Sequence, residues 1–276
     1  MRAVLIVAGK EIRECLRNRW LVAATLLLAG LALTLTFLGS APIGNVGVSA
    51  LDVVIVSLSS LTIFLIPLIA LLISHDAIVG EIERGTMLLL LTYPVARWQV
   101  VIGKFVGHLG VLAFSTLVGY GAAALALLRA PEPVTTPSWL AFGTMIGTSV
   151  LLGAVFIAIG YLLSTLAKDR GTAAGGAIGV WLAMVLIYDM ALLGLLVADQ
   201  GKTLSANVLG VLLLLNPTDI YRLLNLAGSA NISQLSGMAG LTATASVQPA
   251  VLLAALTAWA LLPLALAAMA FSRREL

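Results

Sequence analysis

Long apolar stretches, separated by short polar ones, dominate the chain. Runs such as LLLAGLALTLTFL do not alternate apolar and polar residues, as the strands of a membrane barrel would. A helix that crosses a bilayer needs about 20 mostly apolar residues, because its backbone must satisfy its own hydrogen bonds in lipid. The pattern therefore predicts an all-α, polytopic membrane protein. Its six predicted spans are residues 20–38, 53–78, 100–128, 139–166, 172–197 and 249–271.

The composition agrees with a chain that faces lipid. Hydrophobic residues make up 61% of the chain and charged residues 10%, against roughly 25% charged residues in soluble proteins. A chain so poor in charge cannot cover a globular surface with polar groups, which argues against a soluble enzyme. The first apolar stretch is longer than the core of a typical signal peptide, so we expect an uncleaved first helix. Cys15 is the single cysteine, so an intrachain disulfide is excluded.

The basic residues predict the orientation of the chain. Most of the 15 Lys and Arg residues precede the first span, flank the second-to-third and fourth-to-fifth connections, or follow the last span. Only Arg129, Lys202 and Arg222 fall on the other side. The positive-inside rule then places both termini in the cytoplasm of a bacterial inner membrane, and an even number of spans agrees with this.

Residues 1–19 are predicted to form an amphipathic helix in the headgroup plane. The alternative is an ordinary polar flank that fixes the topology. The apolar residues Val4, Leu5, Ala8, Ile12, Cys15 and Leu16 recur near helical spacing.

The long outer connection, residues 199–248, contains an apolar stretch, 208–215, that is too short to span. We expect a re-entrant or interfacial helix there. A second helix should follow, capped by Thr218 or Asp219.

The second cytoplasmic connection, residues 80–98, carries the strongest functional signal. Glu81, Glu83 and Arg84 are predicted to extend the second helix, and Gly85 then breaks it. Residues 87–91 should form a short apolar helix that Pro94 ends. An apolar helix at the cytoplasmic surface needs a cover, which favours a docked partner protein. The alternative is a re-entrant loop that packs on the bundle.

A few polar and sulfur-containing residues are candidates for chemistry within the membrane. Asp189 is a candidate gate, substrate contact or proton-sensitive site, because ionisable residues are costly in lipid. Its alternative role is that of a helix-end residue bonded to the outer connection. Met184 and Met190 would line a path only for a soft cargo such as Cu(I), and packing is their ordinary role. His75 and His108 could approach each other, but a metal site there lacks further ligands.

Several catalytic motifs are missing from the sequence. GxxxxGK[ST], HExxH and GxSxG do not occur. We therefore expect a transport subunit that binds no cofactor directly and lacks its own catalytic site. If transport uses ATP, the ATPase must be another chain.

The pattern E-x-E-R-G-T, followed by a Leu-rich stretch, T-x-P-V-x-R and G-K-F, resembles the ABC-2 type permeases. The resemblance covers essentially the whole chain, 1–276, as one transmembrane domain. It implies an N-terminal elbow helix, outer re-entrant helices, and a coupling helix that contacts an ATPase holding ATP and Mg²⁺. The positions that match the ATPase-coupling segment are Glu81, Glu83, Arg84, Gly85, Thr86, Met87, Leu88, Leu89, Leu90, Leu91 and Thr92.

Further stretches, including DAIVGE, LLLLTYP and LLLLNPTDIYRL, are similar to the permeases that support copper-site assembly in nitrous oxide reductase. This resemblance implies two permease copies, two cytoplasmic ATPases and a periplasmic copper-handling or repeat protein. Whether such a complex moves copper, a sulfur species or mechanical force stays open. The periplasmic partner would meet Asn216, Pro217, Thr218, Asp219, Tyr221 and Arg222.

Other functions compete with this one. A generic ABC-2 exporter of lipid, peptide or drug shares the fold and differs in cargo. A proton-coupled secondary transporter usually shows an internal repeat and several buried ionisable groups, and we find no clear repeat. A structural membrane anchor is the simplest alternative. Membrane lipid is an expected partner, and nucleic acid is not.

Overall fold

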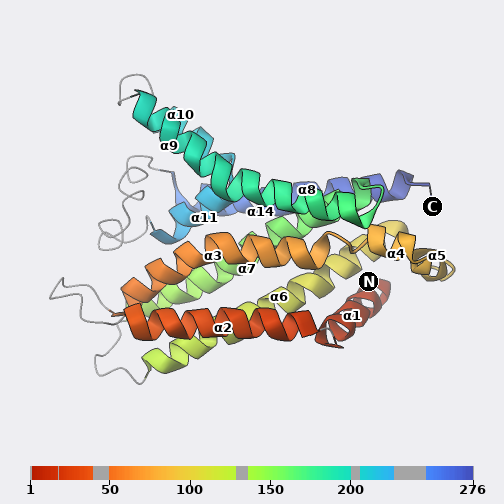
Figure 1. The fold of residues 1–276 in the computed structure, drawn as a ribbon, viewed down its shortest axis with the longest axis horizontal. Helices are drawn as coiled ribbons and strands as arrows, with labels where there is room; N and C mark the ends of the chain where they lie inside the picture. Colours follow the sequence, from red (N-terminus) through yellow and green to blue (C-terminus); the bar gives the residue numbers. More distant parts are fainter. Residues whose placement is uncertain are drawn as a thin grey trace.

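The computed structural model describes residues 2–17, 19–39, 50–128, 136–199, 206–226 and 247–275, and these are helical apart from short turns. The helices form one elongated bundle with both chain termini at the same end (Figure 1). In chain order they are α1 (Arg2–Arg17), α2 (Arg19–Gly39), α3 (Ala50–Ser74), α4 (Val79–Glu83), α5 (Thr86–Leu91), α6 (Arg97–Leu127), α7 (Thr136–Leu166), α8 (Arg170–Leu182), η1 (Ala183–Ile187), α9 (Tyr188–Asp199), α10 (Ala206–Leu214), α11 (Pro217–Leu226) and α14 (Pro249–Arg273).

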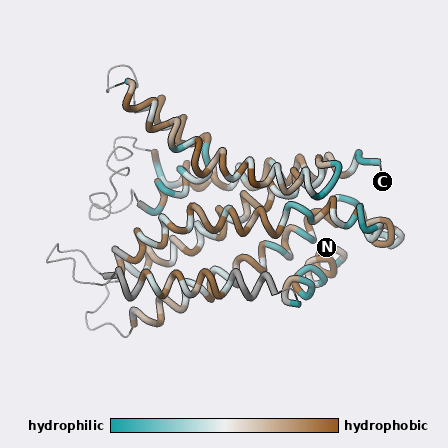
Figure 2. The backbone as a smooth tube through the Cα atoms, viewed as in Figure 1, coloured by the Kyte–Doolittle hydropathy of each residue, from teal (hydrophilic) through white to brown (hydrophobic). Residues whose placement is uncertain are grey.

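The prediction of an all-helical membrane protein is confirmed. Five segments are long and apolar enough to cross a membrane, and they correspond to the second to sixth predicted spans. Helix α2, which holds the first predicted span, runs from Arg19 to Gly39 and contains the apolar segment Thr25–Leu35. Apolar residues dominate the bundle in Figure 2. The five segments are Val54–Glu83, Arg97–Ala126, Thr136–Leu166, Arg170–Asp199 and Pro249–Arg273.

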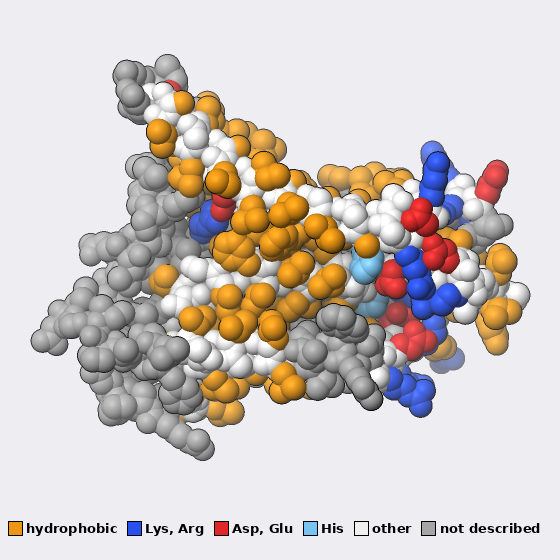
Figure 3. All heavy atoms as spheres, in the orientation of Figure 1, with side chains coloured by type: hydrophobic (Ala, Val, Ile, Leu, Met, Phe, Trp, Pro, Cys, Tyr) orange, Lys and Arg blue, Asp and Glu red, His pale blue; other side chains and the backbone are white. Residues whose placement is uncertain are grey.

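Charged side chains gather at one end of the bundle (Figure 3). We call this the charged end, and it holds α1, α4 and α5 together with the first turns of α6. The opposite end, which holds α10 and α11, is called the far end. The charges therefore lie outside the apolar middle of the bundle, as expected if that middle faces lipid.

Helix α7 forms the centre of the bundle and packs against α3, α6 and α14. Small residues allow these close contacts. A Cβ on Gly160 would collide with Ser74 Oγ of α3, and one on Gly153 would lie 2.5 Å from Leu112 Cδ2 of α6. Close packing of this kind holds helices together in lipid, where burial of apolar surface gives little driving force.

Helix α1 packs on α6 across a pair of glycines. A Cβ on Gly103 would lie 2.7 Å from Val7 Cβ, and one on Gly107 would lie 2.6 Å from Glu11 Cβ. The apolar side predicted for this helix thus covers α6. Leu5 lies outside this contact and is 68% exposed, so the placement of the helix in the headgroup plane stays a prediction.

The connection between α3 and α5 differs from the predicted continuous helix. Helix α3 ends at Ser74, and a turn over residues 75–78 precedes the short helix α4. Ser164 Oγ of α7 accepts hydrogen bonds from the N–H groups of Ile78 and Val79 at 3.0 and 3.1 Å, which fixes this turn on the bundle. The predicted break at Gly85 is confirmed, since its φ of 71° lies in the left-handed region that glycine tolerates best.

The fifth predicted span contains a feature that its hydropathy does not indicate. A π-helical turn, η1, joins α8 to α9, and α9 then diverges from the bundle (Figure 1). This span is the least buried of the five, whereas α7 is the most buried. Among the residues that the structure describes, much of the apolar surface of α8 and α9 is therefore uncovered.

Candidate functional site: a buried ion network and a far-end latch

Lys104 of α6 joins three segments of the charged end. Its side chain is 2% exposed, and Nζ donates to Glu11 Oε1 at 2.5 Å and to Glu81 Oε1 at 2.9 Å. Glu11 belongs to α1 and Glu81 to α4, so a single ammonium group connects α1, α4 and α6. A buried charge without a partner costs several kcal/mol, so the three groups stabilise one another only as a set.

Lys10 and Glu14 of α1 extend this network toward solvent. Lys10 Nζ lies 3.1 Å from Glu81 Oε1 and 3.3 Å from Glu14 Oε1. Burial disfavours the charged form of Lys10, but the nearby carboxylates, led by Glu81, outweigh it and raise the pKa of this amine. Lys10 therefore stays protonated and ties α1 to α4 a second time.

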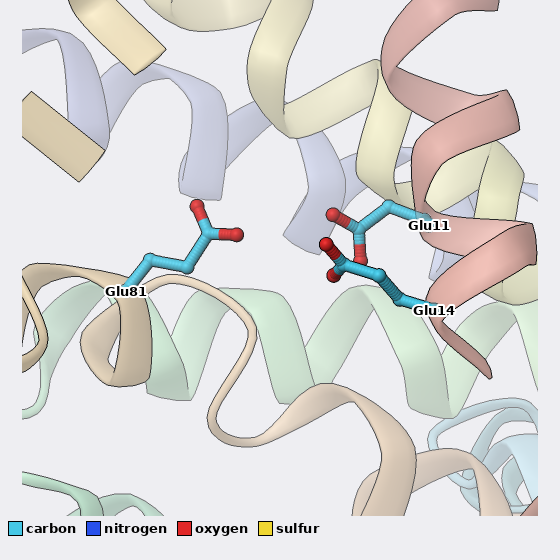
Figure 4. A group of neighbouring side chains, drawn as sticks. All are labelled: Glu11, Glu14 and Glu81. Carbon is cyan, nitrogen blue, oxygen red and sulfur yellow. The ribbon is translucent and has the colours of Figure 1, made fainter. Parts of the chain in front are cut away.

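The carboxylates of Glu11, Glu14 and Glu81 point toward one another from α1 and α4 (Figure 4). Their oxygens lie within 4.8 Å, a spacing that a metal ion could bridge. Lys10 and Lys104 already supply positive charge to these groups. We therefore interpret the group as an ion-pair network.

His108 and Tyr161 carry the network into the bundle. His108 Nε2 lies 3.5 Å from Glu11 Oε2, and the Tyr161 hydroxyl of α7 lies 2.7 Å from His108 Nδ1. The ring of His75 instead lies 3.2 and 3.0 Å from the carbonyl oxygens of Leu71 and Leu72 in its own helix. The two histidines thus have different partners and do not form the pair considered from the sequence.

Helix α5 projects from the bundle beside this network. Leu88, Leu89 and Tyr93 are 57%, 66% and 67% exposed, whereas Met87 is buried. Leu90 and Leu91 pack on the core, and Thr92 closes the last turn through Leu89 O. These exposed apolar side chains form a patch whose contact with water is unfavourable. Patches of this kind are typical of surfaces on which another protein docks.

A groove of about 510 Å³ separates α5 from α1. Charged side chains of the network, with Arg84, line one part of the groove, and Leu89, Leu90 and Tyr93 line another. Thr86 Oγ1 donates to Glu81 O at 3.2 Å, which ties the start of α5 to α4. A partner protein that inserts a side chain or helix into this groove would therefore contact both α5 and the ion-pair network.

Helix α4 is also tied to the fourth-to-fifth turn. Arg170 Nε lies 3.3 Å from Glu83 Oε2, and Arg170 Nη2 donates to Gly80 O at 3.1 Å. The backbone N–H of Arg170 donates to Glu83 Oε1 at 2.9 Å. These contacts connect α4 to α8, in addition to its connections with α1 and α6, so a displacement of α4 would also shift α8.

At the far end, Arg222 of α11 forms ion pairs with two carboxylates. Its guanidinium nitrogens lie 2.5 Å from Asp189 Oδ2 and 2.6 Å from Asp219 Oδ1. Asp189 is therefore a residue of the fifth span bonded to the outer connection, which is the alternative considered from the sequence. Burial raises the pKa of Asp219 to about 7, and Asp189 adds to this effect while Arg222 opposes it.

The start of α11 docks on the π turn. Asn216 Nδ2 and Thr218 Oγ1 donate to Met184 O at 2.8 and 3.3 Å. A π turn interrupts the regular helical hydrogen-bond pattern. The two side chains supply hydrogen-bond donors to the Met184 carbonyl within that turn. The predicted cap was wrong: α11 begins at Pro217, and Asn216 Oδ1 accepts from Thr218 N at 3.2 Å.

The remaining far-end candidates are placed as follows. Asn216, Thr218, Asp219 and Tyr221 are at most 1% exposed, and the Tyr221 hydroxyl lies 3.0 Å from Ser149 Oγ of α7. Pro217 is buried too. These side chains hold α11 on the bundle, so contact with an outside partner stays a prediction. Met184 contributes its backbone carbonyl, and Met190 is 73% exposed.

Sequence reasoning considered Glu81 and His108 for other roles and missed Lys104 and Glu11 as members of the ion network. Lys104 counted only as a basic residue near a span end. Two signals pointed further: Lys104 lies a full turn inside an apolar span, and Glu11 lies beside the apolar positions of α1. Two such charges of opposite sign at the same end are candidates for a buried pair.

Comparison with known proteins adds to this geometry. A sequence model of the ABC-2 family transporter proteins matches residues 5–276. The chain is 48% identical over 277 residues, and 100% of both chains, to the "Probable ABC transporter permease protein NosY" of Pseudomonas aeruginosa. It is likewise 48% identical over 275 residues, and 99% of both chains, to the protein of the same description from Stutzerimonas stutzeri.

Proposed function

Since the chain belongs to the ABC-2 family of transporter permeases, we propose that it is the membrane subunit of an ABC transporter whose ATPase is a separate chain. The observation that carries this proposal is the exposed helix α5 beside the buried Lys104 network. A partner that moves α5 also moves α4, and Lys104 passes that displacement to α1 and α6. Hydrolysis would thus drive a rigid-body switch of the helices.

The proposed topology has six spans, with α2 as the first. The charged end then lies in the cytoplasm, where the basic residues belong by the positive-inside rule. In this topology α1 is the elbow helix, α4 and α5 form the coupling segment, and α10 and α11 lie on the periplasmic side. A single transmembrane domain of residues 1–276 accounts for all of them.

A second copy of the chain is the proposed partner of α8 and α9. Each permease offers one coupling segment, whereas the family resemblance implies two ATPases. Ile178, Ile187 and Leu195 lie on this poorly buried span, and they are 53%, 61% and 43% exposed. A homodimer would place two α5 helices at one membrane surface, one for each ATPase.

The cargo proposal concerns maturation of the copper centres of periplasmic nitrous oxide reductase. It is supported by the full-length similarity to the two permeases described as NosY and by the LLLLNPTDIYRL stretch. A periplasmic copper-handling or repeat protein would meet the far end, where Asp189 and Arg222 couple α11 to the fifth span. Transport of copper or a sulfur species, or mechanical action on that partner, would follow.

Affinity purification of the tagged chain in mild detergent tests the proposal, with every co-purifying chain identified by mass spectrometry. A cytoplasmic ATPase together with a periplasmic copper-handling or repeat protein is the expected result. An ATPase alone would support a generic exporter of lipid, peptide or drug. The lack of any ATPase, with transport intact, would contradict the proposal and favour proton-coupled transport.

The copper assignment has its own test. Deletion of the gene should leave nitrous oxide reductase short of copper, and the intact gene should restore the metal content. A deletion strain with normal reductase copper but altered export of a lipid or drug would reject this cargo. The permease proposal would survive that result.

A further inference from the structure

Helix α1 presents a second face that the bundle does not use. Its inner face packs on α6 and holds the buried residues Val7, Ala8 and Glu11. On the outer side Leu5 and Ile6 are 68% and 72% exposed. Gly9 adds no side chain, and a Cβ there would meet nothing within 4 Å. A shallow depression of about 530 Å³ lies over this face.

Three arginines share the outer face with these aliphatic side chains. Arg2, Arg13 and Arg17 are exposed, and at 100° per residue they fall within about 60° of one another on the helix. The acidic residues of α1 are engaged elsewhere, since Glu11 pairs with Lys104 and Glu14 with Lys10. The guanidinium groups are therefore available to an anion outside the bundle.

The chain itself places this face at the membrane surface. Helix α1 ends at Arg17, and the apolar helix α2 begins at Arg19, so one residue separates them. The outer face must then lie near the level at which α2 enters the hydrocarbon. Aliphatic side chains flanked by arginines suit that level, because the first reach the acyl boundary and the second reach phosphate groups.

We propose that the outer face of α1 binds the headgroups of anionic phospholipids in the adjoining leaflet. Arg13 and Arg17 hold the phosphate groups, and Leu5 and Ile6 rest on the first carbons of the acyl chains. Bound lipid thereby fixes the level of α1, and α1 in turn holds Glu11 against Lys104. The inference rests on the proposed insertion of α2 as a span, and it does not depend on the ATPase or the cargo.

The test uses the full chain in nanodiscs without any ATPase. Cys15 is replaced by serine, Ile6 by cysteine, and an environment-sensitive fluorophore is attached at position 6. The nanodiscs contain phosphatidylglycerol and phosphatidylcholine in one fixed mixture, and either the first or the second lipid carries a bromine quencher. Brominated phosphatidylglycerol should quench the label more strongly than brominated phosphatidylcholine does. Removal of each arginine should lower the enrichment of phosphatidylglycerol around the label about fivefold at low salt.

Charge-matched variants separate this site from a general attraction. Arg13→Gln with Arg17→Gln should abolish the preference, whereas Lys168→Gln with Arg273→Gln, which removes equal charge from exposed positions of the same end, should leave it intact. Equal quenching by the two lipids in the starting protein would overturn the proposal while leaving insertion of α2 intact. Quenching by neither lipid would also overturn the proposal, because position 6 of α1 would then lie away from the acyl chains of both lipids. Shielding of the label only on addition of the ATPase would assign the face to that protein and overturn the proposal.

Discussion

Glu11 of α1 and Lys104 of α6 lie 93 positions apart in the chain, yet Glu11 Oε1 and Lys104 Nζ meet at 2.5 Å inside the bundle. Glu81 of α4 shares the same ammonium group. The network thus connects the N-terminal helix, the proposed coupling segment and the third predicted span at one point. A displacement of α4 would therefore reach α1 and α6 through these ion pairs, in addition to the close packing of α1 on α6.

Lys104→Met tests the dependence of this end on the shared ammonium group. The variant leaves Glu11 and Glu81 buried without their main partner, and removal of one partner from a buried ion pair costs about 3–5 kcal/mol. We expect a clear loss of thermal stability in detergent, read as the midpoint of unfolding. An unchanged midpoint would show that water or a rearrangement replaces the ammonium group.

A neutralised network separates stability from coupling. The combination of Lys104→Met, Glu11→Gln and Glu81→Gln leaves no unpaired buried charge, and such replacements are often nearly neutral in stability. We expect the unfolding midpoint to recover while stimulation of the ATPase by the permease stays low. Recovery of both would reduce the network to a packing feature.

The sequence predicts the helices well and their tertiary connections poorly. The apolar runs place α6, α7 and α14 within a few residues of their observed bounds, because a lipid-facing helix needs a long apolar stretch wherever it packs. The turn after Ser74 is fixed by Ser164, which lies on another helix. The sequence around Ser74 holds no sign of a contact with another helix. The second predicted helix was therefore expected to continue through Glu81 to Arg84.

The candidate site shows the same division. Helix α5 is visible in the sequence, because Gly85 and Pro94 bound an apolar run. The partners of Lys104 come from α1 and α4, and their meeting depends on the crossing of α1 over Gly103 and Gly107. The π turn is similar, since Asn216 and Thr218 supply its donors from another segment.

Leu89→Asp should separate ATP hydrolysis from the response of the permease. Leu89 is 66% exposed on α5, so a carboxylate there leaves folding intact but disfavours an apolar contact with the ATPase. We expect stimulation of ATP hydrolysis by the permease to fall at least tenfold in proteoliposomes, with membrane insertion unchanged. The matched control is Leu89→Met, which keeps the apolar contact. Normal stimulation in Leu89→Asp would contradict docking at α5.

The contribution of Asp219 to folding stability should decrease as the pH rises. The folded pKa of Asp219 is about 7 against an ordinary value of 3.8, so the folded state binds more protons between these values. Stability therefore falls as pH rises from about 4 to about 7, by at most about 1.4 kcal/mol per unit of pKa difference, and it levels off above 7. Thermal unfolding of the detergent-solubilised chain across this range measures the fall. Asp219→Asn should flatten the curve, and an equally steep curve in that variant would assign the proton to another group.

The crossing of α3 and α7 leaves no room for a side chain at Gly160. A Cβ at this position would collide with Ser74 Oγ, and Ser74 is fully buried, so the helices must separate to admit it. Gly160→Ala should therefore destabilise the chain by about 1–3 kcal/mol, the usual effect of overpacking. For a chain of this size that corresponds to a decrease of several degrees in the unfolding midpoint.

Gly147 of the same helix is the matched control for this crossing. A Cβ there would meet nothing within 4 Å, and the residue is exposed on the outer side of α7. Gly147→Ala should leave the unfolding midpoint unchanged or raise it slightly, because alanine favours the helix. Equal decreases in the two variants would trace the effect to the backbone of α7. A decrease confined to Gly160→Ala would locate it at the contact with Ser74, the contact that sets the distance between α7 and α3, the helix that leads into the proposed coupling segment.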